Sequence, residues 1–568
     1  MSLMRETLIL EGFRPLDLEL AALLGRLEPE APPAVALAGA LASAWRLAGH
    51  ACLSLAEVAG RELGRAAGPW GERAPALEAW RADLRASRLV SRGGAMEEAA
   101  PLVLDGDDGL YLQRLHAAEG RVAEAVLARL RPCPPPPGLE GLLAELAGAL
   151  DEGQRGAVRA AFHRGVSILT GGPGTGKTST LGRLLAMALA GEPELRIRLA
   201  APTGKAAARM QEALAATAAH LPERARDALG GLPRAGTLHR LLHERPALDW
   251  LVIDEASMVD LPLMAQVAEL LPPAARLLLV GDADQLASVE AGAVLHHLVA
   301  GLAARSAAVD DGAPPPVTRL TVSRRFRDEG GIGALAAAVR NTDGERVEDV
   351  LAAGDGELEW IRPDRPGWSR RLQDLLEEGT RPFREAPDAA AALAALDQFR
   401  VVCARRTGRL GVEGVNAWCE RRWTAPGQAA RSPILVRAND AVLGLANGDS
   451  GVREGLPGDA AARCLLAPEG VPRELAAAQL PPFDPAWAIT VHQAQGSEAD
   501  NLLLILPEAP SPLLCRELLY TGLTRARRRL TVVASAEALR LAVARRQERG
   551  SGLAVRLTFL TGQEGGGA

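Results

Sequence analysis

Short, wholly apolar runs separated by amphipathic stretches dominate the chain from about residue 150. Four such runs are VSILT (166–170), RIRLAA (196–201), WLVID (250–254) and RLLLVGD (276–282). Runs of this length are typical of strands buried on both faces, and helical stretches between them are typical of crossovers in a parallel sheet. A second set follows at 399–405, 501–507 and 530–535. The pattern therefore predicts an α/β protein with two parallel sheets.

The flanking regions follow different patterns. Residues 1–130 place apolar residues at helical spacing, which predicts a helical N-terminal domain. RPCPPPPG (131–138) reads as a stiff linker, because proline fixes φ and removes a donor. Residues 425–485 combine Gly, Pro and short apolar runs, which indicates a small β-rich insertion. The predicted domains are 1–135, 136–345 and 346–568, the last with the insertion at about 425–485.

Composition bounds the environment of the protein. The 568 residues are 48% hydrophobic and 24% charged, enough to bury several cores, and the net charge of −6 neither demands nor forbids a nucleic-acid partner. The six cysteines form no C-x-x-C pair, so nothing suggests a zinc or iron–sulfur site. No signal peptide and no apolar stretch of about 18 residues appears. We expect a cytoplasmic protein with no membrane partner.

GGPGTGKT, from Gly171 to Thr178, is a phosphate-binding loop in the required context, because it follows a predicted strand and opens a predicted helix. Its backbone N–H groups and the helix N-terminus would hold the phosphates of a nucleoside triphosphate, and Thr178 would bind Mg²⁺. A glycine-rich turn that binds nothing is the alternative. The predicted nucleotide-binding residues of this loop are Gly172, Pro173, Gly174, Thr175, Gly176, Lys177, Thr178 and Ser179.

Lysine is nearly absent from the chain. Of 64 Lys and Arg residues only Lys177 and Lys205 are lysines, which indicates a bias that replaces Lys by Arg wherever physics permits. Lys177 has a reason to persist, since a slender ammonium reaches the β- and γ-phosphates inside a tight loop where a guanidinium is too bulky. Lys205 has a weaker reason. We expect Lys177→Arg to be nearly inactive and Lys205→Arg to be tolerated.

Polar residues end two of the predicted strands that come later in the chain than the loop. Asp254 and Glu255 close WLVID, where a carboxylate can hold Mg²⁺ through water and its neighbour can polarise the attacking water. Gln285, in GDADQ, could contact the γ-phosphate or its water and so report the nucleotide state. The alternatives are a solvated turn for the acids and a polar loop tip for the glutamine.

Further motifs follow the loop in a fixed order and carry a resemblance. GTLHRLL, LTVSRRF, WAITVHQAQGSEAD and LLYTGLTRARRRL resemble those of superfamily 1 helicases. APTGKAAARM, VIDEASMVDLP and TVHQAQGSE resemble, more closely, the RecD family, the alpha subunit of exonuclease V. The resemblance covers about 150–345 and 399–550. It implies two RecA-like motor domains, a helical partner-docking N-terminal domain, an SH3-like β insertion, and ATP and Mg²⁺ as cofactors.

The resemblance also implies residue roles around the nucleotide. Gln154 matches the glutamine that recognises adenine, and Arg325 matches the arginine that contacts the γ-phosphate, although its neighbour Arg324 is an alternative. Arg525 resembles the arginine finger of the second motor domain. Gly496 and Glu498, in QGSE, match the motif that senses the nucleotide. Physically, such arginines stabilise the transferring phosphoryl group only when the lobes close, which couples hydrolysis to hinge motion.

Loops on the top of the two lobes would contact DNA through phosphates and sugars without reading sequence. A lone histidine is more often a core or surface residue, so the two histidines among the candidates depend on their motifs. The run after Arg525 is interpreted as a partly solvated charged face. The DNA-binding candidates are Thr203, Lys205, Thr237, His239, His492 and Gln493.

The implied function is an ATP-dependent 5′→3′ DNA helicase subunit of a RecBCD-type enzyme in double-strand break repair and recombination. It would act on single-stranded DNA at duplex ends with RecB-like and RecC-like partners, and the nuclease would lie on a partner chain. Two alternatives stay open. One is a nucleotide-binding scaffold or regulatory subunit. The other is a translocase that does not split strands, because only HERPALD (243–249) stands where relatives carry a segment able to form a hairpin.

Overall fold

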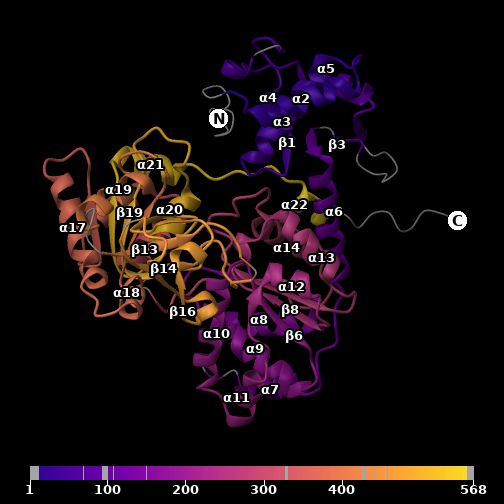
Figure 1. The fold of residues 1–568 in the computed structure, drawn as a ribbon. Coiled ribbons are helices and arrows are strands. Elements are labelled where there is room, and N and C mark those ends of the chain that lie inside the picture. The colour runs from indigo at the N-terminus through magenta and orange to yellow at the C-terminus, as the bar shows by residue number, and fades with distance from the viewer. Residues whose placement is uncertain are drawn as a thin grey trace.

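The computed structural model describes residues 12–67, 70–92, 100–106, 108–146, 148, 150–325, 331–424, 430–440, 442–456 and 458–559. Two α/β lobes lie side by side, and an N-terminal domain sits above the first lobe (Figure 1). Within these ranges, no helix has the length and apolar character needed to cross a membrane.

The first lobe is built on a six-stranded, all-parallel sheet with the order β10-β5-β9-β8-β6-β7. Its strands are β5 (Val166–Gly171), β6 (Ile197–Ala201), β7 (Gly236–Thr237), β8 (Trp250–Ile253), β9 (Arg276–Gly281) and β10 (Val317–Leu320). Its helices are α7 (Leu139–Leu146), α8 (Glu152–His163), α9 (Lys177–Gly191), α10 (Gly204–Ala218), α11 (Glu223–Gly230), α12 (Leu238–Glu244), α13 (Leu261–Leu270) and α14 (Val294–Ala308). The four apolar runs of this region are strands, as predicted, because burial on both faces demands continuous hydrophobicity.

The second lobe repeats this design with five parallel strands in the order β11-β20-β19-β12-β18. The strands are β11 (Leu358–Ile361), β12 (Phe399–Cys403), β18 (Ala488–Thr490), β19 (Ala499–Ile505) and β20 (Ala526–Val533). The helices are α15 (Gly331–Arg340), α16 (Gly344–Ala353), α17 (Trp368–Arg384), α18 (Ala389–Ala395), α19 (Val412–Trp423), α20 (Arg516–Leu523) and α21 (Ala536–Ala544). Two parallel sheets are therefore confirmed.

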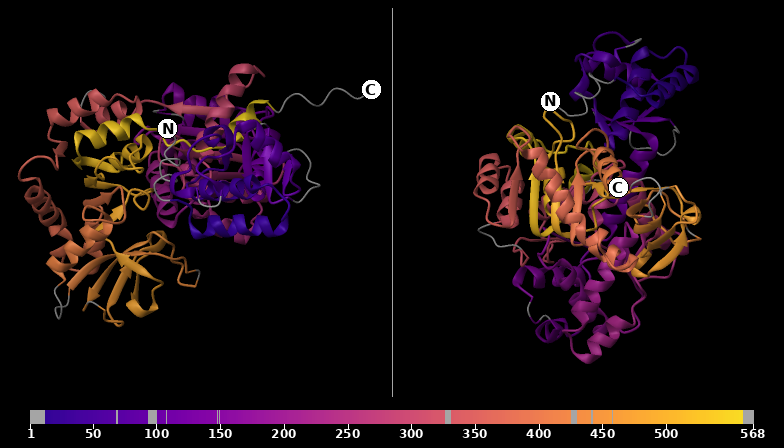
Figure 2. Two further views of the ribbon diagram at one scale, coloured as in Figure 1. Left: turned by 90° about the horizontal axis from the view of Figure 1, so that it is seen from above. Right: turned by 60° about the vertical axis from the view of Figure 1, so that its left-hand side comes forward.

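A small antiparallel sheet interrupts the second lobe, as the Gly- and Pro-rich stretch predicted. Its order is β16-β15-β14-β13-β17, and it projects to one side of the lobe (Figure 2). The strands are β13 (Ala430–Val436), β14 (Ser450–Gly455), β15 (Arg463–Leu466), β16 (Arg473–Ala476) and β17 (Phe483–Pro485). A core of its own, which includes Ile434, Cys464 and Leu466, holds it together. The predicted start of the insertion, at 425–429, lies outside the described residues.

The N-terminal domain is mainly helical, as predicted, but it also contains a four-stranded sheet of order β1-β4-β3-β2. Three or four residues are too few to show a hydrophobic period, so the sequence did not reveal these strands. The helices are α2 (Pro15–Leu27), α3 (Pro33–Leu47), α4 (Leu55–Val58), α5 (Leu77–Ala86) and α6 (Gln113–Ala128). The strands are β1 (Cys52–Ser54), β2 (Val90–Arg92), β3 (Leu102–Asp105) and β4 (Gly109–Leu112).

The hydrophobic cores change at other places than the predicted domain limits of 135 and 345. Helix α6 precedes the proline-rich linker, yet its apolar face joins the core of the first lobe. Helix α15 lies before residue 345 and α16 begins at Gly344, yet both join the core of the second lobe. The domain limits of 135 and 345 stay predictions, while the hydrophobic cores of the two lobes already include α6 and α15. The physical reason is that an amphipathic helix packs against whichever sheet covers its apolar face. The local sequence shows that this face must be buried but does not show which sheet buries it.

The end of the described chain crosses back from the second lobe to the N-terminal domain (Figures 1 and 2). After α21, the Gly550 carbonyl accepts hydrogen bonds from the backbone N–H groups of Ala51 (2.8 Å) and Cys52 (3.2 Å). Helix α22 (Leu553–Phe559) then buries Leu553 and Leu557 in the core of the first lobe. We call residues 546–559 the C-terminal strap. It ties three parts of the molecule together.

Candidate nucleotide site between the two lobes

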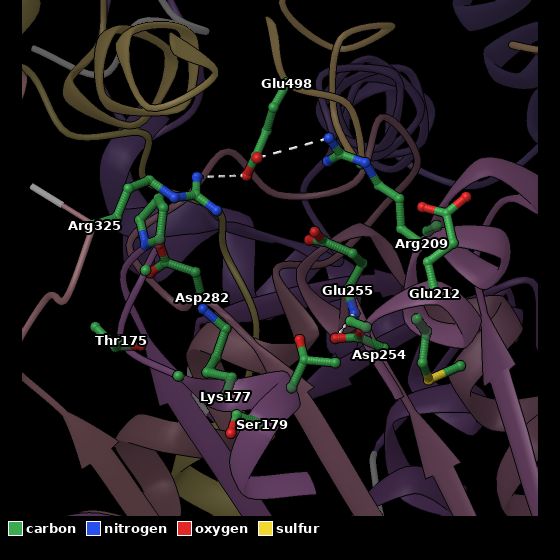
Figure 3. Close-up of a pocket in the computed structure, with 18 of the residues that line it drawn as sticks. Thr175, Lys177, Ser179, Arg209, Glu212, Asp254, Glu255, Asp282, Arg325 and Glu498 are labelled. Carbon is green, nitrogen blue, oxygen red and sulfur yellow. Dashed lines mark hydrogen bonds and ion pairs between the residues drawn. The ribbon is translucent and has the colours of Figure 1, made fainter. Parts of the chain in front are cut away.

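The phosphate loop lies where the strand order places β5 between β10 and β9, at the carboxyl edge of the first sheet. Gly174 and Gly176 have φ values of 74° and 84°, which side chains rarely adopt, and a Cβ on Gly174 would stand 2.3 Å from that of Arg325. Helix α9 begins at Lys177 and points its N-terminus into a cavity of about 590 Å³. The predicted loop residues 173–179 line this cavity (Figure 3).

The side chain of Lys177 spans the interior of the loop. Its ammonium donates hydrogen bonds to the carbonyls of Gly171 (2.6 Å) and Gly172 (3.0 Å). The Thr175 hydroxyl donates to the Gly172 carbonyl as well (2.8 Å). These bonds hold the loop open around the place where phosphates would bind.

Gln154 lies beneath the loop and does not line the cavity. Its amide donates to the Thr175 carbonyl (3.1 Å), and its oxygen accepts from the Asp151 backbone (3.1 Å) in a capping box that starts α8. The Gln154 side chain is buried, so in this structure it braces the loop. Its predicted contact with adenine stays a prediction.

The wall facing Lys177 is acidic. Asp254 and Glu255 follow β8, and Glu255 adopts a φ of 49°, a strained value that turns its side chain into the cavity (Figure 3). Burial, together with the neighbouring Glu255 carboxylate, raises the pKa of Asp254. Asp282 follows β9, and burial raises its pKa too. The amide of Gln285 donates to Asp282 (3.1 Å), so Asp282, which sequence reasoning passed over, orients the predicted sensor.

The residues predicted to hold Mg²⁺ are compatible with it. Thr178 and Asp254 line the same cavity and offer hard oxygen ligands, which this ion prefers. No group of three or more His, Cys, Asp or Glu side chains that could hold a metal occurs in the part of the chain that the structure describes. A magnesium ion here would therefore take its remaining ligands from phosphate oxygens and water.

Arginines from both lobes gather around Glu498 on the opposite side. Its carboxylate accepts from Arg325 (2.7 Å) and Arg527 (3.1 Å) and lies 3.6 Å from Arg209 (Figure 3). Burial alone would raise the pKa of Glu498, but the charges of Arg325 and Arg209 outweigh it and lower the pKa to about 2. Sequence reasoning missed Arg209, and Arg527, interpreted as part of a solvated face, lines the cavity.

Arg525 and Gly496 also line the cavity, and Arg525 is only 3% exposed. Its guanidinium donates to the Thr521 carbonyl (3.2 Å) of α20. Arg324, the alternative to Arg325, turns the other way and reaches the Gln154 oxygen (3.3 Å). Of the two neighbours, Arg325 is therefore the one that faces the second lobe.

None of the six DNA-binding candidates lines this cavity. Thr203 and Thr237 cap α10 and α12, accepting from the backbones of Ala206 (3.2 Å) and Arg240 (3.3 Å). Gln493 caps its own turn by accepting from the Thr490 backbone (2.8 Å). His239 is exposed. These side chains therefore shape the loops at the carboxyl edges of the sheets.

The other two candidates, His492 and Lys205, are half-buried. Burial and the charge of Arg549 lower the pKa of His492 to about 4, so it is neutral at physiological pH. Burial and the charge of Arg400 lower the pKa of Lys205 to about 7. Neither environment is that of an open cationic surface.

The segment before β8 is short, as the sequence indicated. Residues 245–249, all described, connect the end of α12 at Glu244 directly to Trp250, without a hairpin.

Family models match three parts of the chain. An AAA domain matches residues 149–359, the RecBCD enzyme subunit RecD N-terminal domain matches 10–111, and a UvrD-like helicase C-terminal domain matches 485–533. The AAA match contains the phosphate loop, Arg209 and Arg325, and the helicase match contains Glu498, Arg525 and Arg527. Together with the two-lobed fold, they define the class of protein: an ATP-hydrolysing DNA helicase.

Relatives extend over almost the whole chain. The RecBCD enzyme subunit RecD of Mycobacterium tuberculosis is 41% identical over 95% of this chain and 94% of its own length. That of Mycolicibacterium smegmatis is 40% identical over 97% and 99%. The ATP-dependent RecD2 DNA helicase of Deinococcus radiodurans is 32% identical over 82% of this chain and 62% of its own. The chain belongs to the family of the RecBCD enzyme subunit RecD.

Proposed function

We propose that this chain is the ATP-driven 5′→3′ motor subunit of a RecBCD-type enzyme that processes double-strand breaks. The observation that carries the proposal is one cavity lined by the phosphate loop, two acidic strand ends and arginines of both lobes. Such a site can stabilise a transferring phosphoryl group only while the lobes are together, so hydrolysis and lobe movement are coupled.

Each residue has a role in this proposal. Lys177 exchanges its carbonyl partners for the β- and γ-phosphates, and Thr178 and Asp254 hold Mg²⁺, which neutralises phosphate charge when bound. Glu255 polarises the attacking water, and Gln285 detects the γ-phosphate. Arg325 and Arg525 approach the phosphoryl oxygens from opposite sides of the cavity.

The proposed partners are single-stranded DNA at duplex ends and RecB-like and RecC-like subunits in the cytoplasm. Membership of the RecD family supports the assembly, and the matched N-terminal domain is the proposed docking unit. The nuclease then belongs to a partner chain.

A translocase that leaves strand separation to its partners is a second candidate. The observation in its favour is the direct connection of α12 to β8 by residues 245–249, which leaves no hairpin to stand at a fork.

Hydrolysis and unwinding assays test both proposals. We expect ATP hydrolysis to be stimulated by single-stranded DNA, and unwinding of 5′-tailed duplexes by the assembled complex. Lys177→Gln should abolish hydrolysis and leave assembly with the partners intact. Absence of DNA-stimulated hydrolysis in the assembled complex would refute the motor. Unwinding by the isolated chain would refute the second candidate, the translocase that leaves strand separation to its partners.

A further inference from the structure

A single first-lobe residue, Leu286, is built into the second lobe. It directly follows Gln285, and its side chain is 1% exposed within the hydrophobic core of the second lobe. Among the described residues, all other members of that core lie at Ile332 or later in the chain. The loop that carries the predicted γ-phosphate sensor is thus anchored across the cleft.

Two buried side chains of the second lobe complete the anchor. The Leu286 backbone N–H donates to the Thr521 hydroxyl (2.7 Å), and the Gln495 amide donates to the Leu286 carbonyl (2.8 Å). Thr521 is fully buried and Gln495 is 7% exposed. Both bonds exclude water, so losing either would leave a buried polar group of Leu286 without a partner.

The other end of the same loop is fixed to the first lobe. Asp284 pairs with Arg319 of β10 (2.7 Å), and Asp282 accepts from the Gln285 amide (3.1 Å). Gln285 therefore lies between a first-lobe anchor and a second-lobe anchor. A change in the distance between the lobes must therefore change the backbone torsions of the few residues that lie between these two anchors, Gln285 among them.

Thr521 also connects this loop to the arginine on the far side of the cavity. Its hydroxyl accepts from Leu286, while its carbonyl accepts from Arg525 (3.2 Å). The Gln495 turn supports the same arginine, because the Ser497 carbonyl lies 3.5 Å from the Arg525 guanidinium. One short unit of the second lobe thus positions groups on both sides of the phosphate site.

We propose that Thr521 and Gln495 are positioning residues that hold the main chain of Leu286 between them, an arrangement called the clamp below. When the lobes close, the clamp fixes the position of Gln285 relative to Arg525 across the phosphate site. Neither Thr521 nor Gln495 lines the nucleotide cavity. The clamp rests on the proposed function only for the role of Gln285. Breaking it should slow hydrolysis without weakening the binding of ATP or DNA.

The test uses the full chain with its partners. Thr521→Val keeps the shape of the side chain but removes the hydroxyl, Thr521→Ser keeps the hydroxyl, and Gln495→Glu replaces the donating amide by an acceptor. Thr531→Val is the matched control, since Thr531 is also buried in the second lobe but lies on β20, away from the clamp. Measured quantities are kcat and KM for DNA-stimulated hydrolysis, affinity for a fluorescent ATP analogue, and Tm.

We expect Thr521→Val and Gln495→Glu to lower kcat on the order of tenfold or more, as an orphaned buried N–H or C=O implies. KM and analogue affinity should change less than about twofold, and Thr521→Ser should recover most of the rate. Equal effects of Thr521→Val and Thr531→Val would overturn the proposal, as would a rise of KM in place of a fall of kcat. If Thr521→Val also lowers Tm, Thr521→Ser decides the outcome, because the retained hydroxyl must restore kcat if the hydrogen bond to Leu286 is the cause.

Gln285→Ala separates this proposal from the proposed function. If Gln285→Ala keeps the full kcat, the role of Gln285 fails. If Gln285→Ala is slow while Thr521→Val is normal, the clamp alone fails. If both are slow and the double variant is no slower than Gln285→Ala, the two residues act as one unit.

Discussion

At the scale of single residues, charge and burial explain why lysine persists at two positions in an arginine-rich chain. Lys177 threads into a loop whose carbonyls lie 2.6 and 3.0 Å from its ammonium, a space that suits a slender side chain. Lys205 is half-buried, and the desolvation of its ammonium, together with the charge of Arg400, lowers its pKa to about 7. A lysine there can lose its proton, whereas an arginine cannot.

This environment changes the expectation for Lys205→Arg. The sequence predicted tolerance, but a permanent charge beside Arg400 should lower the free energy of unfolding by about 1–3 kcal/mol, the usual range for an unfavourable single substitution. Lys205→Met, similar in shape and neutral, should preserve stability. Chemical denaturation measures both. Greater stability of the Arg variant than of the Met variant would refute the burial argument.

At the scale of elements, the C-terminal strap explains why α6 belongs to the first lobe. Glu119 of α6 is fully buried and accepts from Tyr111 (3.0 Å), Ser551 (2.6 Å) and Arg556 (3.1 Å). These partners come from the N-terminal sheet and from the strap. One carboxylate thus joins β4 and α6, which are adjacent in sequence, to the strap, which lies 432 residues further along the chain at Ser551.

Replacing this carboxylate should release the strap. Glu119→Ala leaves the Arg556 charge with one carboxylate partner fewer, and removing one member of a buried pair costs roughly 3 kcal/mol. Hydrogen exchange of the α22 amides should accelerate accordingly. Arg121→Ala, on the same helix but in an exposed pair with Glu269, should change stability by about 0.5 kcal/mol or less. Unchanged exchange in Glu119→Ala would contradict this role of the strap.

At the scale of the whole molecule, Glu498 holds the cleft together by its ion pairs. Arg209 belongs to α10 and Arg325 follows the last strand of the first sheet, while Glu498 and Arg527 belong to the second lobe. One carboxylate among several arginines leaves this side of the cavity positive, which favours a triphosphate.

The lowered pKa of Glu498 fixes the pH dependence of this contact. A carboxylate whose pKa falls from 4.5 to about 2 contributes stability above pH 4.5 and loses it as the pH falls toward 2. The distance between dyes on the two lobes should therefore stay constant from pH 9 to about 5 and grow only in acid. Glu498→Gln should show the larger distance at every pH. A transition near neutral pH in the parent would contradict this assignment.

Local chemistry determined much of this protein from the sequence alone. Continuous hydrophobic runs predict the buried strands. The loop from Gly171 to Thr178 is predicted by glycines that allow positive φ next to the start of a helix. Asp254, Glu255 and Gln285 were found because they follow such strands. Each of these signals lies within a few residues of the group it describes.

Only the tertiary structure decided which residues of the two lobes contact one another across the cleft. Arg209 and Arg527 look like ordinary polar residues until the two lobes meet at the cavity, and Leu286 looks like a core residue of the first lobe, to which it belongs in sequence. The sheet that α6, α15 and α16 cover was equally undetermined. The physical reason is that these contacts join residues far apart in the chain, and a local pattern shows that a face must be buried but not against which partner.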